Sequence, residues 1–318
     1  MSRAVVATSY GGPESLTVQE APVPAPGPGE VTIEVRAAGV NPIDLKLASG
    51  AMGADESRLP MPLGLEVAGV VTAVGPGPER AQGPAGPVAV GDEVIGYPVS
   101  GGYADAVTVP ATSVYPKPST LSFEEAAGLS LTGVTAYHLL EATGVVAGDT
   151  VLVHGSSGGV GLMTAQLALL RGATVVGTAA PRRHDLLRDL GVVPVEYGDG
   201  LLERVRAAAP QGVDVALDTV GTDEAVDVSL ALVRDRHRIA TVAAFGRAGR
   251  DGIQLLGGGP GADPGTDIRE RGRLVLTGLA EAGRLRVLVA RSFPLEQAGE
   301  AHRLVGDGHA GGKVVLVP

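Results

Sequence analysis

The stretch TVLVHGSSGGVGLMTAQLALLRGATVVGTAA, residues 150–180, decides the fold of this chain. It begins with the β-branched apolar run Thr150–Val153, which is typical of a strand buried on both faces. A glycine-rich turn follows, and Leu162–Leu170 then carries apolar residues at helical spacing. Gly172 ends this helix, and Ala173–Val176 forms a second buried strand. The order strand, glycine turn, helix, strand predicts one unit of a doubly wound parallel sheet.

The glycine turn has the spacing that suits a dinucleotide diphosphate. Gly155, Gly158 and Gly161 form a variant of the GxGxxG pattern. Glycine permits positive φ and lets phosphate approach backbone N–H groups at a helix start, where the helix dipole favours anions. The alternative is a glycine-rich turn in another kind of α/β protein, which the flanking strands and helix make the weaker interpretation. The residues expected to contact the cofactor here are Gly155, Ser156, Ser157, Gly158, Gly159 and Val160.

The segment after the second strand indicates which cofactor binds. NAD sites usually place an acidic residue there for the ribose 2′-OH, but residues 178–184 read TAAPRRH and contain none. Arg182 and Arg183 suit a 2′-phosphate, because the guanidinium fork matches phosphate geometry. The segment therefore predicts NADPH rather than NADH, with Ala179 as a further contact. The alternative is that the two arginines only begin a solvated helix.

Composition narrows the class of protein. The chain has 318 residues, of which 44% are hydrophobic and 19% charged, as in a compact folded protein of two domains. Its net charge of −10 argues against nucleic acid or an anionic membrane as the main partner. It has no cysteine, which excludes disulfides and thiolate metal sites. We see neither a signal-peptide core nor an apolar run long enough to span a bilayer, so we expect a cytoplasmic protein.

Three regions follow one another along the chain. Residues 1–118 contain short alternating strands and Pro/Gly turns, which predict a small β-barrel or sandwich, with a poorly ordered surface loop over residues 75–90. Residues 119–262 alternate strand and helix and predict a six-stranded parallel sheet. Residues 263–318 carry two more helices and two strands, which we expect to return to the first domain. The six sheet strands are expected at 150–153, 173–176, 194–197, 213–218, 238–242 and 253–256.

The chain resembles a known family in several motifs that occur in order along nearly its whole length. These are VRAAGVNPIDLKLASG, MPLGLEVAGVVTAVG, VGDEVIGY, GGYADAVTVP, AAGLSLTGVTAYHLL, VHGSSGGVG, GVDVALDTVG and PLEQAGEAHRLVGDGHAGGKVVLVP. They are similar to zinc-independent quinone oxidoreductases (zeta-crystallin-like) of the medium-chain dehydrogenase/reductase superfamily. The resemblance implies an α/β fold in which a Rossmann NADPH-binding domain (119–262) is inserted into a GroES-like catalytic domain (1–118 and 263–318). It also implies a site in the cleft between the domains and a homodimer.

Zinc alcohol dehydrogenases of the same superfamily carry Cys near the position of Asn41 and a His-Glu pair near Leu65-Glu66. This chain lacks both the Cys and the His, as well as the cysteine-rich structural lobe. We therefore expect no metal, and we expect Glu66 to be a structural carboxylate. The histidines show no spacing that would rebuild a site, and we expect surface or capping roles for all of them: His138, His154, His184, His237, His302 and His309.

The segment NPIDLK predicts the catalytic residues. Its NPxDxK form is similar to a branch that includes plant enone reductases, so the resemblance implies a quinone or an α,β-unsaturated carbonyl as the substrate. Without zinc, another group must stabilise the developing oxyanion and supply a proton, and Lys46 is the candidate for both. Asn41 is expected to orient the nicotinamide carboxamide or the substrate carbonyl, and Asp44 to hold Lys46 or the ribose. The alternative is structural: a turn at Asn41, a helix cap at Asp44 and a solvent-facing Lys46.

The resemblance places further cofactor contacts. Thr132 resembles a ligand of the nicotinamide-side phosphate or amide, and Tyr197 matches a tyrosine near the 2′-phosphate. Asp218 ends the fourth strand at the edge where ligands gather, although it has a competing structural role as a turn cap. The remaining expected contacts are Val242, Ala243, Phe245 and Lys313.

The sequence is compatible with three functions. The first is an NADPH-dependent reductase of quinones or enones. The second is a non-catalytic NADPH-binding protein, as in the lens crystallins related to this family, although the retained NPxD segment argues against it. The third is an enoyl reductase of a polyketide-type pathway, which shares the fold.

Overall fold

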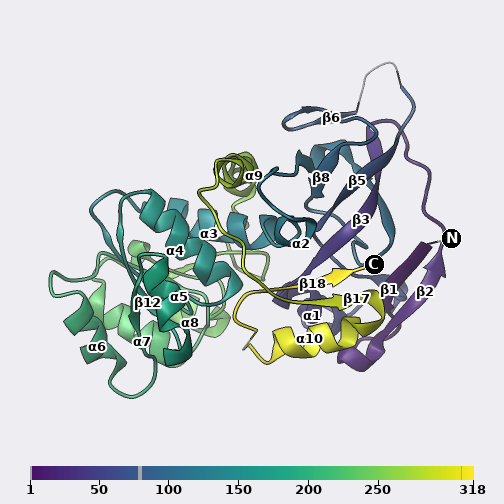
Figure 1. Cartoon of the computed structure of the whole chain (residues 1–318). Coiled ribbons are helices and arrows are strands. Elements are labelled where there is room, and N and C mark those ends of the chain that lie inside the picture. The colour runs from purple at the N-terminus through teal and green to yellow at the C-terminus, as the bar shows by residue number, and fades with distance from the viewer. Residues whose placement is uncertain (1, 78–80, 309) are drawn as a thin grey trace. The chain divides into compact units, whose positions relative to one another are not determined.

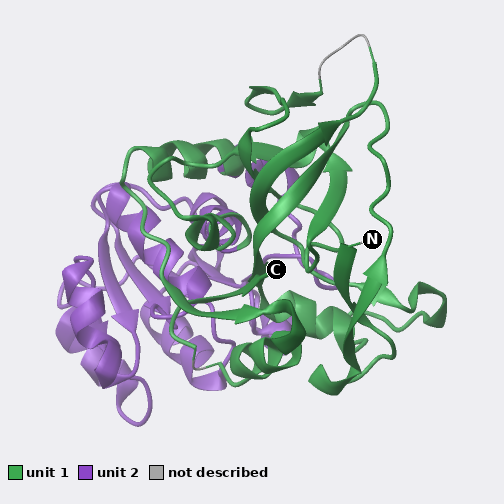
Figure 2. Cartoon of the chain, turned by 45° about the vertical axis from the view of Figure 1, so that its right-hand side comes forward, with its two compact units in different colours: residues 1–131, 273–318 green, residues 132–272 purple. Residues whose placement is uncertain are grey.

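The computed structural model describes residues 2–77, 81–308 and 310–318. The chain divides into two compact units, shown in different colours in Figure 2. Unit 1 comprises residues 1–131 and 273–318, and unit 2 comprises residues 132–272. The sequence placed the two boundaries earlier, after residues 118 and 262. Both observed boundaries fall inside helices, α3 (Ser130–Ala142) and α9 (Thr266–Glu281), which explains why loop composition did not locate them.

The described part of unit 2 contains a six-stranded parallel sheet in the order β13-β12-β11-β14-β15-β16. This is the doubly wound order in which the first strand lies at the centre, so the predicted fold class is confirmed. The chain runs through these strands from teal to green in Figure 1. Their bounds are β11 (Thr150–His154), β12 (Thr174–Thr178), β13 (Val193–Val195), β14 (Val215–Asp218), β15 (Ile239–Thr241) and β16 (Gln254–Leu255).

The central strands form because their residues are apolar on both faces. Val151, Leu152 and Val153 of β11 have no exposed surface, although neighbouring side chains point to opposite faces. Helices therefore cover both faces of this sheet. The helices that belong wholly to unit 2 are α4 (Gly159–Leu170), α5 (His184–Asp189), α6 (Leu201–Ala208), α7 (Asp223–Leu232) and α8 (Phe245–Asp251).

Unit 1 joins the two ends of the chain in one sheet. The last strand, β18 (Lys313–Val317), pairs antiparallel with β3 (Glu30–Val40), as the yellow and purple strands of Figure 1 show. The sequence expected residues 263–318 to return to the first domain, and unit 1 contains residues 273–318 of this segment. The other strands of this sheet are β5 (Val67–Val74), β8 (Glu93–Gly96), β9 (Ala106–Pro110), β10 (Val114–Pro116) and β17 (Val289–Pro294).

Smaller elements complete unit 1. A three-stranded sheet in the order β2-β1-β4 packs beside the larger one, and a hairpin of β6 and β7 lies within residues 75–90. The prediction of a poorly ordered loop there was wrong in part, because Ala81 and Val88 are buried and hydrogen-bonded to each other through their backbones. The bounds are β1 (Ser2–Ala7), β2 (Leu16–Ala21), β4 (Met61–Pro62), β6 (Gln82–Gly83), β7 (Gly86–Pro87), α1 (Pro42–Ala48), α2 (Phe123–Ala126) and α10 (Ala298–Gly306).

Both units also contain short 3-10 helices. One of them, η4, holds Arg182 and Arg183, so that the α-helix α5 begins only at His184. Pro181 at the start of η4 fixes the backbone there. The set is η1 (Pro13–Ser15), η2 (Glu56–Arg58), η3 (Ala111–Ser113), η4 (Pro181–Arg183), η5 (Arg236–Arg238) and η6 (Leu295–Gln297). Among the described residues, no helix combines the length and the apolar character needed to cross a membrane.

Candidate active site and cofactor site

The glycine turn after β11 is closed so tightly that it leaves no room for a side chain at Gly155 or Gly161. Gly155 has φ +74°, in the left-handed region. The N–H of Gly158 donates to the Gly155 carbonyl at 3.0 Å, and a Cβ added to Gly161 would lie 2.1 Å from that carbonyl oxygen. α4 begins at Gly159, so its first N–H groups have no acceptor within the helix. The turn therefore presents backbone donors at a helix N-terminus, as a diphosphate site requires.

Strand β12 holds this turn from behind. Thr178 accepts from the Gly155 N–H through its hydroxyl at 3.0 Å, and its carbonyl accepts from the Ser156 N–H at 3.0 Å and the Ser156 hydroxyl at 3.1 Å. Ser156 is fully buried, and a Cβ at Gly177 would lie 2.5 Å from its Oγ. The polar groups of Ser156 thus anchor the turn. Gly158 is exposed, but its N–H is already bonded to the Gly155 carbonyl. Ser157, Gly159 and Val160 are half-buried at the N-terminus of α4.

The segment after β12 carries the two arginines that the sequence assigned to a 2′-phosphate. Arg182 is exposed and Arg183 is half-buried in η4. Ala179 is buried, and its carbonyl lies 3.1 Å from Nε2 of His184, which fixes the path of the chain into η4. Tyr197, two residues after β13, is 51% exposed. Arg182 and Tyr197 therefore lie at the surface of unit 2, where a ligand can reach them.

The ends of β14 and β15 are joined by a buried carboxylate. Oδ1 of Asp218 accepts from the N–H groups of Val220 at 3.0 Å and Gly221 at 2.9 Å. Oδ2 accepts from the Thr241 hydroxyl at 2.6 Å. That hydroxyl oxygen in turn accepts from the N–H groups of Ala243 and Ala244, at 3.0 and 2.8 Å. These bonds favour the structural alternative for Asp218, because its carboxylate shapes the two turns.

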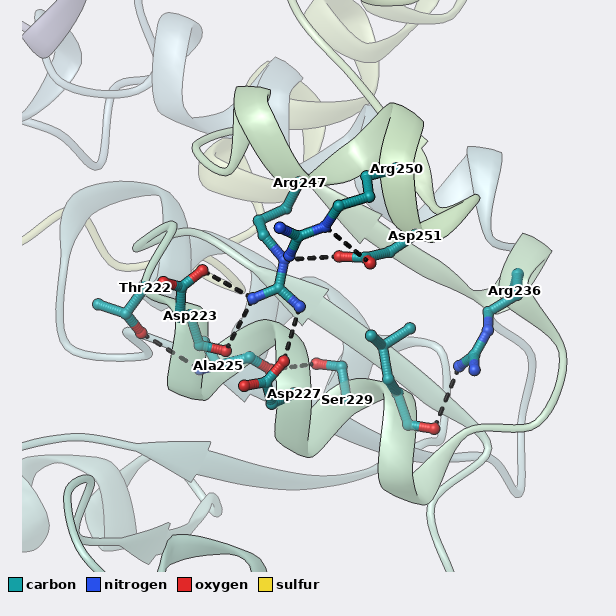
Figure 3. A network of polar contacts seen from close by, with 10 residues as sticks. Thr222, Asp223, Ala225, Asp227, Ser229, Arg236, Arg247, Arg250 and Asp251 are labelled. Carbon is teal, nitrogen blue, oxygen red and sulfur yellow. Dashed lines mark hydrogen bonds and ion pairs between the residues drawn. The ribbon is translucent and has the colours of Figure 1, made fainter.

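The turn after β15 leads into α8, which a second network holds in place (Figure 3). Val242 and Ala243 are half-buried and Phe245 is 37% exposed, with its ring so close to Gly259 that a Cβ there would lie 2.2 Å from it. Arg247 binds three carboxylates, at 2.6 to 2.7 Å: Asp223 and Asp227 on α7 and Asp251 at the end of α8. The hydrogen bonds that Arg247 donates to these carboxylates, that to Asp227 first among them, raise the pKa of Arg247 further above its ordinary value.

In unit 1, the segment NPIDLK forms the start of α1. Asn41 is the N-cap, Pro42 takes the first helical position, and Asp44 accepts from the Asn41 N–H at 2.9 Å, completing a capping box. The structural alternative for Asp44, a helix cap, therefore describes its contacts. Lys46 lies on the same helix and is half-buried. Thr132, in the first turn of α3, is buried.

The side chain of Asn41 belongs to a buried charged cluster. Nζ of Lys313 lies 2.6 Å from Oδ1 of Asn41 and 2.7 Å from Oε1 of Glu66. Nδ2 of Asn41 donates to the same Glu66 oxygen at 3.1 Å and to the Gly39 carbonyl at 3.3 Å. All three side chains are buried, so these interactions occur away from water. The contacts found for Lys313 are thus with Asn41 and Glu66 of unit 1, whereas the sequence expected it at the cofactor.

A second buried cluster adjoins this one. The hydroxyl of Tyr103 neighbours the carboxylate of Asp44, and the ring of His302 meets the Tyr103 ring edge-on, with centroids 5.8 Å apart. Burial raises the pKa of Asp44 to about 7, raises that of Tyr103 and lowers that of His302 to about 4. Nε2 of His302, the Tyr103 hydroxyl and Oδ1 of Asp44 find no good hydrogen-bond partner among the described residues. The sequence did not single out Tyr103 for any role.

Comparison with known proteins identifies the family. Residues 27–119 match the profile of the alcohol dehydrogenase GroES-like domain, and residues 190–316 match that of a zinc-binding dehydrogenase. The quinone oxidoreductase of Mus musculus is 30% identical over 335 aligned residues, which cover 100% of this chain and 98% of that protein. The chain belongs to the quinone oxidoreductase-type members of the medium-chain dehydrogenase/reductase superfamily. It is therefore an oxidoreductase with a nicotinamide cofactor.

Another relative is matched over part of its length. The synaptic vesicle membrane protein VAT-1 homolog of Rattus norvegicus is 37% identical over 227 residues, covering 69% of this chain. The chain spans about half of that protein, 54% of its length. The alignment thus describes a shared portion of the two proteins.

Several solved structures have the same fold as this chain, and their titles name different cofactors and activities. The mycobacterial protein Rv1454c complexed with NADPH superposes with a TM-score of 0.84 at 32% identity and covers 100% of both chains. A structure titled NAD-dependent alcohol dehydrogenase gives 0.86 at 32% identity over 99% of both chains. The CurK enoyl reductase gives 0.82 at 27% identity, also over 99% of both. These oxidoreductases differ in cofactor and substrate, so the fold alone selects neither.

Among the described residues, the side chains at the expected metal position do not suit a zinc ion, although one matching profile is that of a zinc-binding dehydrogenase. Zinc is held by thiolate, imidazole and carboxylate donors. Here an amide, Asn41, and a carboxylate, Glu66, surround the ammonium of Lys313, which repels a metal cation. In the part of the chain that the structure describes, no three His, Asp or Glu side chains meet in a metal-binding group.

The expectation of surface or capping histidines was wrong for half of them. His138, His154 and His302 are buried, and burial lowers the pKa of each. Nε2 of His154 lies 3.2 Å from the Ser229 hydroxyl. His237 is exposed, as expected, and His309 lies outside the described residues.

Proposed function

We propose that this oxidoreductase uses NADPH to reduce quinones or α,β-unsaturated carbonyls by hydride transfer without zinc. The observation that carries the proposal is the glycine turn at Gly155–Gly161, followed after the next strand by Arg182 and Arg183, with no acidic residue in positions 178–184. The turn suits a diphosphate, and the two guanidinium groups suit the phosphate that distinguishes NADPH from NADH. The NADPH complex of the mycobacterial relative supports the same cofactor.

The residues proposed to hold the cofactor lie in unit 2. Ser157, Gly159 and Val160 offer N–H groups to the diphosphate, and Gly158, which is exposed and has no side chain, lets it approach the backbone. The hydrogen bonds described above fix the backbone of this surface. The proposed cofactor residues that take part in them are Gly155, Ser156, Ala179 and Asp218. The other proposed contacts are Thr132, Tyr197, Val242, Ala243 and Phe245.

Bound NADPH would supply the hydride, and the protein must stabilise and protonate the acceptor. Addition of hydride to a conjugated carbon or a quinone places negative charge on the carbonyl oxygen, and a proton then completes the two-electron reduction. We propose Lys46 as the residue that stabilises this oxygen and donates the proton. Asp44 holds the first turn of α1, which carries Lys46, through its bond to the Asn41 N–H.

Metal-free chemistry is supported by the contacts of Asn41 and Glu66. Both positions correspond to ligand or near-ligand positions of zinc relatives, and both contact the Lys313 ammonium. The Asn41 amide is engaged at its oxygen and its nitrogen, which favours a structural role over direct binding of substrate. In this proposal Lys46, rather than a metal, counters the oxyanion.

An enoyl reductase is the second candidate, favoured by the likeness to the CurK enoyl reductase. It differs from the leading proposal in substrate: an enoyl thioester rather than a free quinone or enone. A non-catalytic NADPH-binding protein is the third. The homodimer and the cytoplasmic location stay predictions.

The experiment that separates these functions is NADPH oxidation against a panel of acceptors. The panel contains 1,4-benzoquinone, 9,10-phenanthrenequinone, a short 2-alkenal and crotonyl-CoA, with NADH run in parallel. We expect turnover with a quinone or the alkenal and a preference for NADPH. Turnover with crotonyl-CoA alone would select the enoyl reductase, and tight NADPH binding without turnover would select the binding protein. A preference for NADH would contradict the role of Arg182 and Arg183.

Lys46 is tested by the variant Lys46→Ala. If Lys46 protonates the acceptor, kcat should fall by about 100-fold, the range of general acid catalysis, while the Kd for NADPH stays within twofold. Lys117→Ala is a control, since that lysine pairs with Glu93 on β8. An unchanged kcat in Lys46→Ala would remove Lys46 from the mechanism.

A further inference from the structure

A buried ion pair ties four separate segments of unit 1 together. Glu66 has no exposed surface and Lys313 is 5% exposed. Glu66 precedes β5, and Lys313 opens β18, the strand that returns from the far end of the chain. Asn41 connects β3 to α1, and Leu131 lies in the first turn of α3. Their side-chain and backbone groups meet at one carboxylate.

Both oxygens of this carboxylate are satisfied. Oε1 of Glu66 accepts from Nζ of Lys313 at 2.7 Å and from Nδ2 of Asn41 at 3.1 Å. Oε2 accepts from the N–H of Leu131 at 2.8 Å. Buried charges are tolerated only with such complete pairing. The cluster therefore depends on the positive charge of Lys313.

Two glycines make room for the pair. A Cβ at Gly39 would lie 2.4 Å from Oε1 of Glu66 and 2.3 Å from the Ala127 carbonyl oxygen. A Cβ at Gly128 would lie 2.9 Å from Cγ of Lys313. Neither glycine has a φ in the left-handed region, so the close approach itself requires glycine. The surrounding backbone is thus shaped around a carboxylate and a lysine stem.

The Lys313 ammonium also fixes the amide of Asn41. Oδ1 of Asn41 accepts from Lys313 at 2.6 Å, and Nδ2 donates to Glu66 and to the Gly39 carbonyl. With both ends of the amide engaged, the side chain has one orientation. Asn41 is the N-cap of α1, so the Lys313 ammonium is linked through this residue to the helix that carries Lys46.

We propose that Lys313 is the built-in cation of a closed cation site formed by Glu66 and Asn41, and that it acts as a positioning residue for the start of α1. Its ammonium stands among residues whose counterparts hold a metal ion in zinc-dependent members of the superfamily. The site takes a primary ammonium group, because two of its three N–H donors can bond the two oxygen acceptors contacted here. This inference deepens the metal-free part of the proposed function and rests on it.

The test is chemical rescue of Lys313→Ala with a small primary amine. The variant leaves the Glu66 carboxylate buried without its partner, and we expect its thermal midpoint to fall by about 10 °C. Propylammonium chloride should restore at least half of that loss, because it can place an ammonium in the space vacated by the side chain. Tetramethylammonium chloride, which has no N–H donor, should restore nothing and controls for ionic strength.

Two matched variants complete the design. Lys117→Ala removes a lysine with a buried stem from an ion pair with Glu93 elsewhere in unit 1, so propylammonium should not raise its midpoint. Lys313→Ala combined with Glu66→Gln removes both charges and should lose the response to the amine. No response of Lys313→Ala, or an equal response of Lys117→Ala, would overturn the proposal.

A kinetic measurement separates positioning from simple stabilisation. The cofactor residues lie in unit 2, so Lys313→Ala should keep the Kd for NADPH within twofold while kcat falls by about tenfold, the pattern of a lost transition-state interaction. Propylammonium should restore kcat over the same range of amine concentrations in which it restores the thermal midpoint of unfolding. If kcat stays at the wild-type value in the folded variant, Lys313 is not a positioning residue.

The wild-type protein provides a test that needs no variant. The chain has only three lysines, so native acetylation followed by peptide mass spectrometry reports each of them. Lys313 should react at least about 100-fold more slowly than half-buried Lys46, as expected when modification requires opening of the cluster. Equal rates would overturn the proposal. Stoichiometric zinc in the wild-type protein would instead contradict the metal-free function itself.

Discussion

The hydroxyl of Thr241 donates a 2.6 Å hydrogen bond to the carboxylate of Asp218. The two residues are register partners at the carboxyl ends of β14 and β15, and both side chains are buried. Ligands of doubly wound sheets bind at this edge. The bond therefore couples two turns that border the proposed cofactor surface.

Thr241→Val should release the turn after β15. The variant loses the bond to Asp218 and the acceptor for the N–H groups of Ala243 and Ala244. We expect the free energy of unfolding to fall by about 1–3 kcal/mol and the Kd for NADPH to rise about tenfold. Thr277→Val, whose hydroxyl bonds only backbone carbonyls of its own helix, is the control. An unchanged Kd in Thr241→Val, measured by calorimetric titration, would contradict this role.

Gly161→Ala should abolish the diphosphate turn. Its Cβ would lie 2.1 Å from the Gly155 carbonyl, so the turn must open. We expect NADPH affinity to fall by at least about 100-fold, since each 1.4 kcal/mol of strain costs tenfold. Gly278→Ala in α9 has open space around its Cβ and should bind NADPH normally. Fluorescence titration measures the NADPH affinity of both variants. Equal affinities of Gly161→Ala and Gly278→Ala would show that this turn does not hold the cofactor.

Arg182→Ala and Arg183→Ala should change the preference between the two nicotinamide cofactors. Each variant loses a charged partner of the 2′-phosphate, which NADH lacks. We expect kcat/KM for NADPH to fall about tenfold per arginine and that for NADH to stay within twofold. Arg234→Ala, an exposed arginine of the same unit, is the control. A parallel loss with both cofactors would assign the two arginines to folding rather than to recognition.

Asp44 should make the protein less stable as the pH rises. Burial raises its pKa from 3.8 to about 7. The unfolded chain releases this proton near pH 3.8 and the folded protein only near pH 7. The stabilising contribution is thus complete below pH 3.8 and is lost as the pH rises through 7. Because a pKa difference of one corresponds to about 1.4 kcal/mol, the loss amounts to at most about 4 kcal/mol.

The variant Asp44→Asn isolates this contribution. Asparagine cannot ionise, and its side-chain oxygen can still accept from the Asn41 N–H. The variant should therefore gain stability relative to wild type between pH 4 and pH 8 in urea unfolding. If the two stability curves run parallel over this range, Asp44 does not titrate as stated.

His302 should make the protein less stable as the pH falls. Burial lowers its pKa from 6.5 to about 4, so the unfolded chain takes up a proton that the folded protein excludes. This contribution is present above pH 6.5 and is lost as the pH falls through 4, by about 3 kcal/mol at most. His302→Phe keeps a ring against Tyr103 but cannot titrate. Between pH 6.5 and 4, we expect the wild-type protein to lose more stability than the variant. An equal loss would show that His302 does not contribute to the pH dependence of stability.

The sheet of unit 2 could be predicted because its signals are local. Apolar β-branched runs bounded by glycine located all six strands, although the ends differ by a few residues. In unit 1, β9 (Ala106–Pro110) and β10 (Val114–Pro116) give weak sequence signals because they are short and end in proline. In β17 (Val289–Pro294) alternation is weak because most side chains are exposed.

The charged cluster of unit 1 could not be predicted from the same signals. Asn41 and Lys313 are 272 residues apart, and no periodicity relates positions at that distance. A weak signal did exist: only three of the 25 basic residues are lysines, and one of them opens the apolar strand KVVLV. The buried roles of Tyr103 and His302 likewise depend on tertiary packing, which their local sequence does not encode.

The central claim, a metal-free NADPH reductase, is tested most directly by turnover at known metal content. The rate of NADPH oxidation with 9,10-phenanthrenequinone is measured on protein purified without chelator, before and after dialysis against a zinc chelator, with zinc quantified in the same samples. We predict substoichiometric zinc and a rate that dialysis leaves unchanged. A rate that falls with zinc and returns when zinc is restored would contradict the account.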